Sequence, residues 1–401
     1  MTEGPLHGIT ILELSIAATG PYAVALLADQ GASVVKVERP GIGDLARWVG
    51  CSHNGMSALF LTCNRGKRSI AIDITTERGR DLVRALAREA DVVVENYRPG
   101  VLDRRGLGYD DLRRDRADGA RELIYVSISG FGPVGPYAAK SAYDTVIQSY
   151  AGLAANQADP ATGEPVYLRQ TAADKITALT AAQAITAALL ARERGRGGQH
   201  LHLSMLDAVV SFLWVDTAGN EVLRDADGSM PSNFVANFKP MRFADGWGIA
   251  TPTSDADFAG ICAALGIHGA DAPEVATMVA RATHPHEMAR MMELIYGAAA
   301  QLTTAEAIAR LEAERVPCGV IVNARALPDD PHVRDIGLFV DSEHPTVGRV
   351  RLPRHPTQFG KTPAVHRGPS PTLGEHTDEI LAELGHFTDS VAELRAAAIV
   401  A

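Results

Sequence analysis

The stretch Ile9-Thr-Ile-Leu-Glu-Leu14 and the stretch Ser33-Val-Val-Lys-Val-Glu38 are short runs rich in β-branched and aliphatic residues. Between them lie a turn at residues 15–21, a helical segment at Tyr22–Gln30, and Gly31, which ends that helix. A strand, a helix and a second strand within about 30 residues form a βαβ unit, which implies a parallel sheet. The turn is not G-x-G-x-x-G, and the chain contains no G-x-x-x-x-G-K-[ST], so both common nucleotide fingerprints are absent.

The same alternation continues along the chain. The runs of Val and Ile do not alternate with polar residues, which indicates strands covered on both faces. We therefore predict an α/β fold, with a doubly wound, Rossmann-like large domain formed by residues 1–220 together with 335–401. The further strands expected in it are Ser69–Asp73, Asp91–Glu95, Leu123–Ile128 and His200–Leu203, and the further helices are Thr76–Ala90, a long one after Asp174, Met205–Trp214 and a closing Glu375–Leu384.

The character of the sequence changes at the polar loop Asp225–Asn233. Residues 221–334 are predicted to form a smaller α+β domain. The short strands expected there are Met241–Phe243, Trp247–Thr251 and Val316–Val322, and the helices are Asp255–Leu265, Pro285–Gln301 and Thr304–Arg315.

Composition limits the possible functions. The chain has 401 residues, of which 46% are hydrophobic, and a net charge of −10, which argues against a nucleic-acid binder. Its four cysteines are widely spaced and fit neither a disulfide framework nor a zinc site, so we expect a cytoplasmic protein without a metal. The N-terminus lacks the pattern of a signal peptide, and the weakly apolar run 176–191 is too short to cross a bilayer, so no membrane partner is expected.

The Ala-rich segment Thr171–Ala191 has a clear start and stop, because it ends in a basic turn and glycines at 192–198. Asp174 lies at or next to its N-cap, where backbone N–H groups and the helix dipole favour the ionised form and lower the pKa of the carboxyl. The simpler interpretation is a capping residue worth about 1 kcal/mol. The alternative is a nucleophilic carboxylate.

Basic residues cluster in the first 105 positions, several of them in loops after strands, where α/β folds bind ligands. In an acidic protein such a cluster suggests a phosphate-bearing ligand, although a solvated surface is the simpler interpretation. The cluster comprises Arg39, Arg65, Lys67, Arg68, Arg98, Arg104 and Arg105.

Several blocks of the sequence form a recognisable series. The blocks are Leu6–Leu14, Gly20-Pro21, Leu27–Glu38, Asn64–Asp73, Asp91–Gly100, Leu123–Gly132, Gly135–Tyr137 and Leu373–Ile380. In this order they resemble the class III (family III) CoA-transferases of the CaiB/BaiF type, a superfamily that includes formyl-CoA transferase and alpha-methylacyl-CoA racemase. The resemblance covers nearly the whole chain, which makes it much more specific than any one motif.

The resemblance implies a role for particular residues. The family's catalytic aspartate falls on Asp174, and an acidic position of the preceding loop falls on Asp144. Coenzyme A, bound as the substrate thioester, is expected at Arg39 and Arg104 for its phosphates and at Asn96-Tyr97-Arg98 beside pantetheine and adenine. The implied assembly is a homodimer of two interlocked rings. The implied substrates are an acyl-CoA and a carboxylic acid.

The chemistry of CoA transfer agrees with a carboxylate nucleophile, since the thioester energy must be conserved. Asp174 would attack the donor thioester to give an aspartyl anhydride, and CoA would then convert the anhydride to an aspartyl-CoA thioester. The acceptor acid would attack next and leave with the CoA. Water must be excluded because anhydrides hydrolyse readily.

Four alternatives to this function and its substrates make demands that the sequence can be compared with. A racemase of the superfamily needs a second base, but Tyr143 stands where racemases resemble Gly-His-Asp, and a phenol is a poor base at neutral pH. Oxalate is disfavoured as a substrate because Ala18 replaces a glutamine of formyl-CoA transferases, and the small residue suggests a roomier acyl pocket. A non-catalytic acyl-CoA-binding protein would not need Asp174, and a dehydrogenase would need the missing glycine fingerprint.

His200 and His202 share one face of a strand but lack a third metal ligand.

Overall fold

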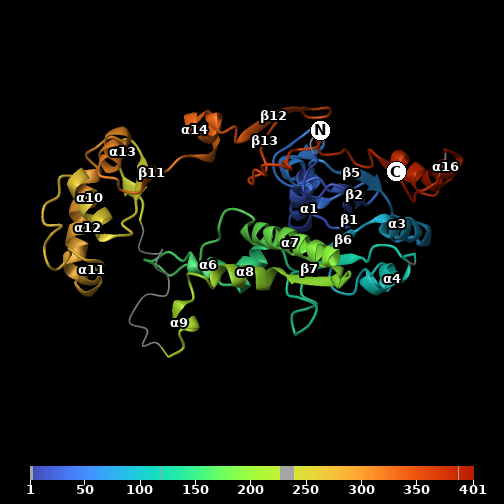
Figure 1. Ribbon diagram of the computed structural model, residues 1–401, viewed down its shortest axis with the longest axis horizontal. Helices are drawn as coiled ribbons and strands as arrows, with labels where there is room; N and C mark the ends of the chain where they lie inside the picture. The colour runs from blue at the N-terminus through green and yellow to red at the C-terminus, as the bar shows by residue number, and fades with distance from the viewer. Residues whose placement is uncertain (1–2, 118, 226–238, 387) are drawn as a thin grey trace. The chain divides into compact units, whose positions relative to one another are not determined.

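The computed structural model describes residues 3–117, 119–225, 239–386 and 388–401 (Figure 1). The chain forms two compact units. The first comprises the residues up to Thr217 together with Gly337–Ala401, and the second is Ala218–Ile336. The predicted polar loop Asp225–Asn233 lies outside the described residues beyond its first position.

A six-stranded parallel sheet forms the centre of the first unit, in the order β5-β2-β1-β6-β7-β8. The predicted α/β fold with a parallel central sheet is confirmed. Successive strands are added on one side of β1 and then on the other, so the order reverses between β1 and β6. Ligands of such sheets bind beyond the carboxyl ends of the strands at this reversal. The strands are β1 (Thr10–Glu13), β2 (Ser33–Glu38), β5 (Arg68–Ala71), β6 (Val92–Glu95), β7 (Ile124–Ser129) and β8 (His200–Ser204).

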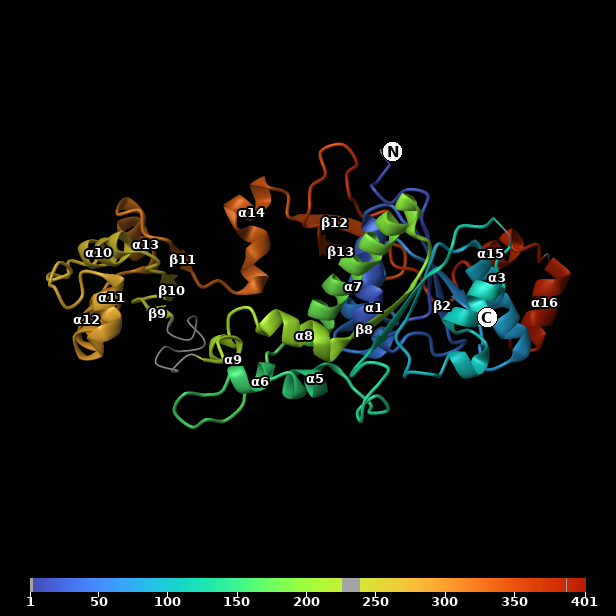
Figure 2. The same cartoon turned by 60° about the horizontal axis from the view of Figure 1, so that its bottom comes forward.

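Helices cover both faces of this sheet (Figures 1 and 2). On β1, Ile11 belongs to one apolar core with α1 (Thr19–Asp29), α7 (Ala172–Ala191) and α8 (Met205–Leu213), whereas Leu12 belongs to the core on the other face. Consecutive residues are therefore buried on opposite faces, which is why apolar residues such as Ile11 and Leu12 follow one another directly in these strands. The helices of the second face are α3 (Glu77–Glu89), α4 (Tyr109–Arg114), α15 (Thr377–Glu383) and α16 (Thr388–Ala396).

The C-terminal part differs from the sequence prediction. The helix predicted at Glu375–Leu384 is present as α15, but it does not close the chain, since α16 follows it. The antiparallel hairpin β12 (Phe339–His344) and β13 (Gly348–Pro353) was not predicted. The alternation Arg349-Val-Arg-Leu352 in β13 was a signal that the sequence prediction missed, whereas β12 is mostly exposed and carries little apolar pattern.

The second unit has its own core, formed by apolar residues of a three-stranded antiparallel sheet and the surrounding helices. Two of its helices begin with capping boxes, at Ser254 and Thr303. Its elements are α9 (Gly219–Val222), β9 (Met241–Arg242), β10 (Trp247–Ala250), α10 (Asp255–Ala264), α11 (Met278–Thr283), α12 (Pro285–Ala299), α13 (Thr304–Ala313), β11 (Cys318–Val320) and α14 (Pro331–Asp335).

The remaining short elements of the first unit lie in its loops. They are β3 (Ser52–His53), β4 (Met56–Ser57), α2 (Ala58–Asn64), α5 (Asp144–Tyr150) and α6 (Leu153–Asn156). Within the described ranges, no helix combines the length and the apolar character needed to cross a bilayer.

Candidate active site

The turn between β1 and α1 lies at the reversal of strand order. Asn96, directly after β6, holds this turn from the neighbouring strand. Its Oδ1 accepts the N–H of Ile16 at 2.9 Å, and its Nδ2 donates to the carbonyl of Ile16 at 2.8 Å. The loops after the two central strands are thereby tied together at the place where this fold binds ligands.

A buried ionic cluster lies beneath the same turn. The Nζ of Lys36 is 2.8 Å from Oδ2 of Asp44 and 3.3 Å from Oε1 of Glu13, and it donates to the carbonyl of Ser15 at 2.8 Å. Although burial alone would lower the pKa of Lys36, the carboxylates of Asp44 and Glu13 raise it above its usual value. Because charges this deeply buried are costly when unpaired, the cluster fixes the path of the turn.

Ala17 is the residue of the turn that carries backbone strain. Its φ of 66° lies in the left-handed region, which is unfavourable for a residue with a Cβ. The Oδ1 of Asp44 accepts the N–H of Ala17 at 2.8 Å and so holds it there. Three residues on, Gly20 must remain a glycine, because a Cβ would lie 2.3 Å from the Oγ of Ser15.

Asp174 is the third residue of α7, and its side chain does not cap the helix. The N-cap, Thr171, makes no side-chain capping bond. Instead, Asp144 accepts the backbone N–H of Asp174 at its Oδ1, at 3.0 Å, and Gln148 donates to the other oxygen of Asp144 at 2.6 Å. Asp144 therefore takes the helix-end role expected of Asp174, and the Asp174 carboxylate is left for another use.

The surroundings of Asp174 reverse the expected direction of its pKa. Burial raises the pKa of the carboxyl from 3.8 to about 6, the hydroxyl of Thr19 lowers it in part, and the nearby Asp144 raises it. The sequence prediction of a lowered pKa was wrong, because desolvation and a like charge outweigh the hydrogen bond and the helix end. Thr19 Oγ1 donates to Asp174 Oδ1 at 2.5 Å.

Asp174 opens into a cleft of about 340 Å³ at the carboxyl ends of the central strands. Among the described residues that line it, Asp174 is the one carboxylate and Arg98 and Lys140 are the two cations. The lining comprises Ile16, Ala17, Thr19, Leu45, Asn96, Tyr97, Arg98, Pro99, Ile128, Ser129, Gly130, Ala138, Lys140, Ser141, Ala142, Tyr143, Asp174 and Met205. The cleft thus joins a half-buried acid, a hydroxyl and two cations.

The predicted site residues divide between this cleft and its surroundings. Asn96, Tyr97, Arg98, Tyr143 and Asp174 line it together. Ala18 and Asp144 are buried next to residues of the lining, whereas Arg39 and Arg104 are exposed and lie outside it.

Part of the predicted basic cluster has a structural role instead. Arg65 pairs with Asp29 at 2.7 Å, Lys67 pairs with Glu13 at 2.6 Å, and both cations are buried. Arg68 pairs with Glu379 and Glu383. For these three residues, ion pairs within the fold replace the predicted role in binding a ligand.

A smaller cavity of about 130 Å³ adjoins the cleft. His200 and His202 face it from one side of β8, as predicted, with ring centroids 3.8 Å apart. Burial, and then the second imidazole, lower the pKa of His200 to about 4, and its Nε2 lies 2.9 Å from the Oγ of Ser127. Burial raises the pKa of Glu95 in the same cavity to about 7. In the described part of the chain, no group of three or more His, Cys, Asp or Glu could hold a metal ion.

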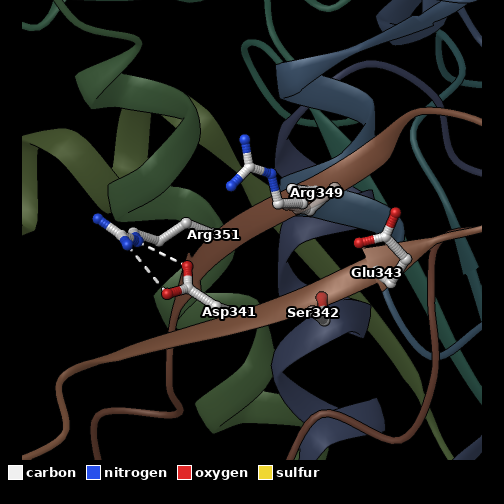
Figure 3. A pocket seen from close by; sticks show the side chains of 6 residues that line it. Asp341, Ser342, Glu343, Arg349 and Arg351 are labelled. Atoms are coloured by element: carbon white, nitrogen blue, oxygen red, sulfur yellow. Dashed lines mark hydrogen bonds and ion pairs between the residues drawn. The ribbon is translucent and has the colours of Figure 1, made fainter.

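A third hollow lies on the β12–β13 hairpin and has a volume of about 580 Å³ (Figure 3). Charged side chains line it, and Arg351 makes two bonds to Asp341 across the strands, at 2.6 Å and 2.9 Å. None of the predicted site residues lines this hollow. The cleft at Asp174 is therefore the candidate site.

Comparison with known proteins identifies the class. The family described as CoA-transferase family III matches residues 6–377. The crystal structure of a CaiB/BaiF family protein from Brucella suis superposes with a TM-score of 0.82 and 34% identity, and the match covers 96% of this chain and 100% of that one. The chain belongs to CoA-transferase family III and is a CoA-transferase.

Curated relatives with named substrates are similar over nearly their whole length. The chain is 35% identical over 391 residues to a succinate–glutarate CoA-transferase of Agrobacterium fabrum, covering 95% of this chain and 96% of the relative. It is 31% identical over 404 residues to the human succinyl-CoA:glutarate CoA-transferase, and the match covers 99% of this chain and 90% of the human protein.

Three residues of the site were missed by the sequence reasoning: Thr19, Asp44 and Lys140. A signal existed for Thr19, which directly precedes Gly20-Pro21 in the turn after the first strand, where ligands of this fold bind. No local pattern marks Asp44 or Lys140, because their positions depend on loops folding back onto the turn.

Proposed function

We propose that this protein moves CoA from an acyl-CoA thioester to a carboxylic acid, with Asp174 as the covalent nucleophile. The observation that carries the proposal is the position of the Asp174 carboxylate, which faces the cleft with Oδ1 bonded to Thr19. No described residue donates a hydrogen bond to its Oδ2. A carboxylate with one oxygen oriented and the other free is suited to attack a bound carbonyl.

The reaction divides into exchanges at two carbons. Oδ2 attacks the donor carbonyl and expels CoA thiolate, which leaves an aspartyl anhydride. The thiolate attacks Cγ of Asp174 and releases the donor acid, which leaves an aspartyl-CoA thioester. The acceptor acid repeats these exchanges in reverse order and leaves as the new acyl-CoA.

Dicarboxylic acids are the first substrates to test. Both relatives described above are named for succinate or succinyl-CoA and glutarate. In the cleft, Arg98 offers a cation to a carboxylate that does not react, whereas the ammonium of the second lining cation, Lys140, donates to the hydroxyl of Tyr150 at 2.7 Å. We therefore propose succinyl-CoA and glutarate as the first donor and acceptor.

For CoA itself we propose the positions implied by the family resemblance. Asn96, Tyr97 and Arg98 line the cleft and would lie beside pantetheine and adenine. The exposed Arg39 and Arg104 would receive the phosphates. The proposed assembly is an interlocked homodimer, and light scattering coupled to gel filtration should give twice the mass of the chain.

Intact-mass spectrometry after mixing with succinyl-CoA tests the nucleophile. We expect a wild-type adduct with the mass of CoA less one water, formed without acceptor and lost on adding glutarate. The variants Asp174→Ala and Asp174→Asn should give no adduct and no glutaryl-CoA. A matched control is Asp245→Asn, since Asp245 belongs to the second unit and accepts hydrogen bonds from Thr304.

Two results would contradict the proposal. An Asp174→Asn variant that still transfers CoA would exclude this nucleophile. A wild-type protein that binds acyl-CoA but gains no adduct would fit the non-catalytic binding protein. Racemase activity is measured in the same samples as solvent deuterium at the α-carbon of a 2-methylacyl-CoA, and we expect none, since Asp174 is the one carboxylate among the described lining residues.

A further inference from the structure

The hydroxyl of Thr19 is directed at one particular atom of the proposed nucleophile. Thr19 is buried, opens α1, and donates from Oγ1 to Oδ1 of Asp174 at 2.5 Å. In the described part of the chain, this is the one hydrogen bond that the side chain of Thr19 makes. Both residues line the same cleft, so the contact is inside the site.

The turn that carries Thr19 is held from two sides. Asn96 fixes Ile16, and Asp44 fixes Ala17. Because both supports are hydrogen bonds to the backbone of the turn, the hydroxyl keeps its place while the carboxylate changes its chemical state. A donor fixed in advance needs no reorganisation during the reaction.

Oδ1 passes through a sequence of charges in the proposed reaction. In the anhydride and in the thioester it is a neutral carbonyl oxygen. When CoA thiolate attacks Cγ of the anhydride, a C–S bond forms and the π electrons of the carbonyl move onto Oδ1. Collapse restores the carbonyl and breaks the bond to the donor carboxylate, which leaves.

The second exchange at Cγ also places a negative charge on Oδ1. An oxygen of the acceptor carboxylate bonds to Cγ, Oδ1 again takes the negative charge, and CoA thiolate leaves as the C–S bond breaks. In both tetrahedral states the charge on Oδ1 exceeds that in the intermediates before and after. A donor to Oδ1 therefore lowers the barriers more than it stabilises the intermediates.

We propose that Thr19 is the oxyanion donor for the two exchanges at Cγ of Asp174. This rests on the proposed function, because it requires Asp174 to become acylated. The attack on the donor places its charge on the substrate oxygen, so that step does not need Thr19 as its oxyanion donor.

The test uses Thr19→Val, which keeps the β-branched shape and removes the hydroxyl, and Thr19→Ser, which keeps the hydroxyl. Loss of one oxyanion donor typically lowers the rate by about 10² to 10³-fold, so this loss is expected for glutaryl-CoA formation by the Val variant. The Ser variant should remain within about tenfold of wild type. Measurements at pH 8 keep Asp174 ionised, and the thermal midpoint of each variant checks its fold.

Rapid quench after mixing with succinyl-CoA separates the steps, because the anhydride adds the acyl group in place of a proton and the thioester adds the mass of CoA less one water. The Val variant should accumulate the acyl adduct and form the CoA adduct slowly. A Thr19 that only positions Asp174 would instead reduce both adducts equally.

Each other outcome overturns a definite statement. Three results would overturn the role of Thr19 and leave the covalent function standing. They are a Val variant that forms the CoA adduct at the wild-type rate, a Val variant that loses both adducts, and a Ser variant as slow as the Val variant. A wild-type protein without either adduct would overturn the covalent function on which this role depends.

Discussion

Replacing Asp174 by Asn should stabilise the protein at neutral pH while it removes activity. The side chain keeps its shape and can still accept the hydroxyl of Thr19, but it no longer carries a charge into a desolvated site beside Asp144. Burial raises the pKa of Asp174 from 3.8 to about 6, which is about two pK units. At 1.36 kcal/mol per unit this corresponds to about 3 kcal/mol, or about 1.5 to 3 kcal/mol once solvent in the open cleft is allowed for.

The direction of this stability difference between wild type and Asp174→Asn follows from proton linkage. Below about pH 4 both the folded and the unfolded chain hold the proton, so Asp174 imposes no cost. Between pH 4 and pH 6 the unfolded chain releases the proton while the folded chain retains it, and the wild type loses stability relative to the variant. Above pH 6 the difference should stay constant at its full value.

Urea unfolding of wild type and Asp174→Asn between pH 4 and pH 8 measures this difference. The opposite-sign control is Asp73→Asn, because hydrogen bonds from Thr75 lower the pKa of Asp73, and that carboxylate stabilises the fold when ionised. A difference between wild type and Asp174→Asn that does not change with pH, or a variant that is less stable at pH 8, would refute the assigned burial of Asp174.

Three further predictions concern the site, the buried cluster beneath it and an exposed ion pair. The single-turnover rate of acylation should rise with pH through about 6, because only ionised Asp174 attacks, and stopped-flow release of CoA at pH 5 to 8 would show a flat profile if this is wrong. Lys36→Met should lower the free energy of unfolding by about 3–5 kcal/mol, since it leaves buried Asp44 without its cation, whereas Glu13 keeps Lys67. Arg395 forms an exposed pair with Asp378, so Arg395→Ala should lower the free energy of unfolding by at most about 1 kcal/mol. Equal stability losses for the Lys36 and Arg395 variants would contradict the distinction between buried and exposed ion pairs.

The central sheet could be predicted because its strands are local signals. β1 and β2 are short apolar runs bounded by turns, and their burial on both faces needs no knowledge of distant residues. The β12–β13 hairpin gave a weaker signal, because its apolar face consists of a few half-buried or exposed residues, such as Val350 and Leu352, opposite a charged face. What was predictable was therefore the part whose stability comes from periodic burial.

The site was predictable in position but not in electrostatics. The sequence places Asp174 at the start of a helix, and the structure agrees. The direction of its pKa depends on Asp144, 30 residues earlier, and on burial, which only the folded chain shows. Likewise Arg65 and Lys67 appeared to be ligand-binding residues because their partners, Asp29 and Glu13, lie 36 and 54 residues away.

The enclosed charges under the β1–α1 turn also restrict how this protein can diverge. Lys36, Glu13, Asp44 and Lys67 come from separate segments, and each is satisfied by others of the group. Lys67 pairs with Glu13, Glu13 with Lys36, and Lys36 with Asp44, so losing Glu13 leaves Lys67 without its carboxylate and losing Lys36 leaves Asp44 without its cation. Single substitutions at these two central positions are therefore costly. Libraries that aim to reshape this pocket should vary the four positions as one block, or leave them untouched and diversify the lining residues above them.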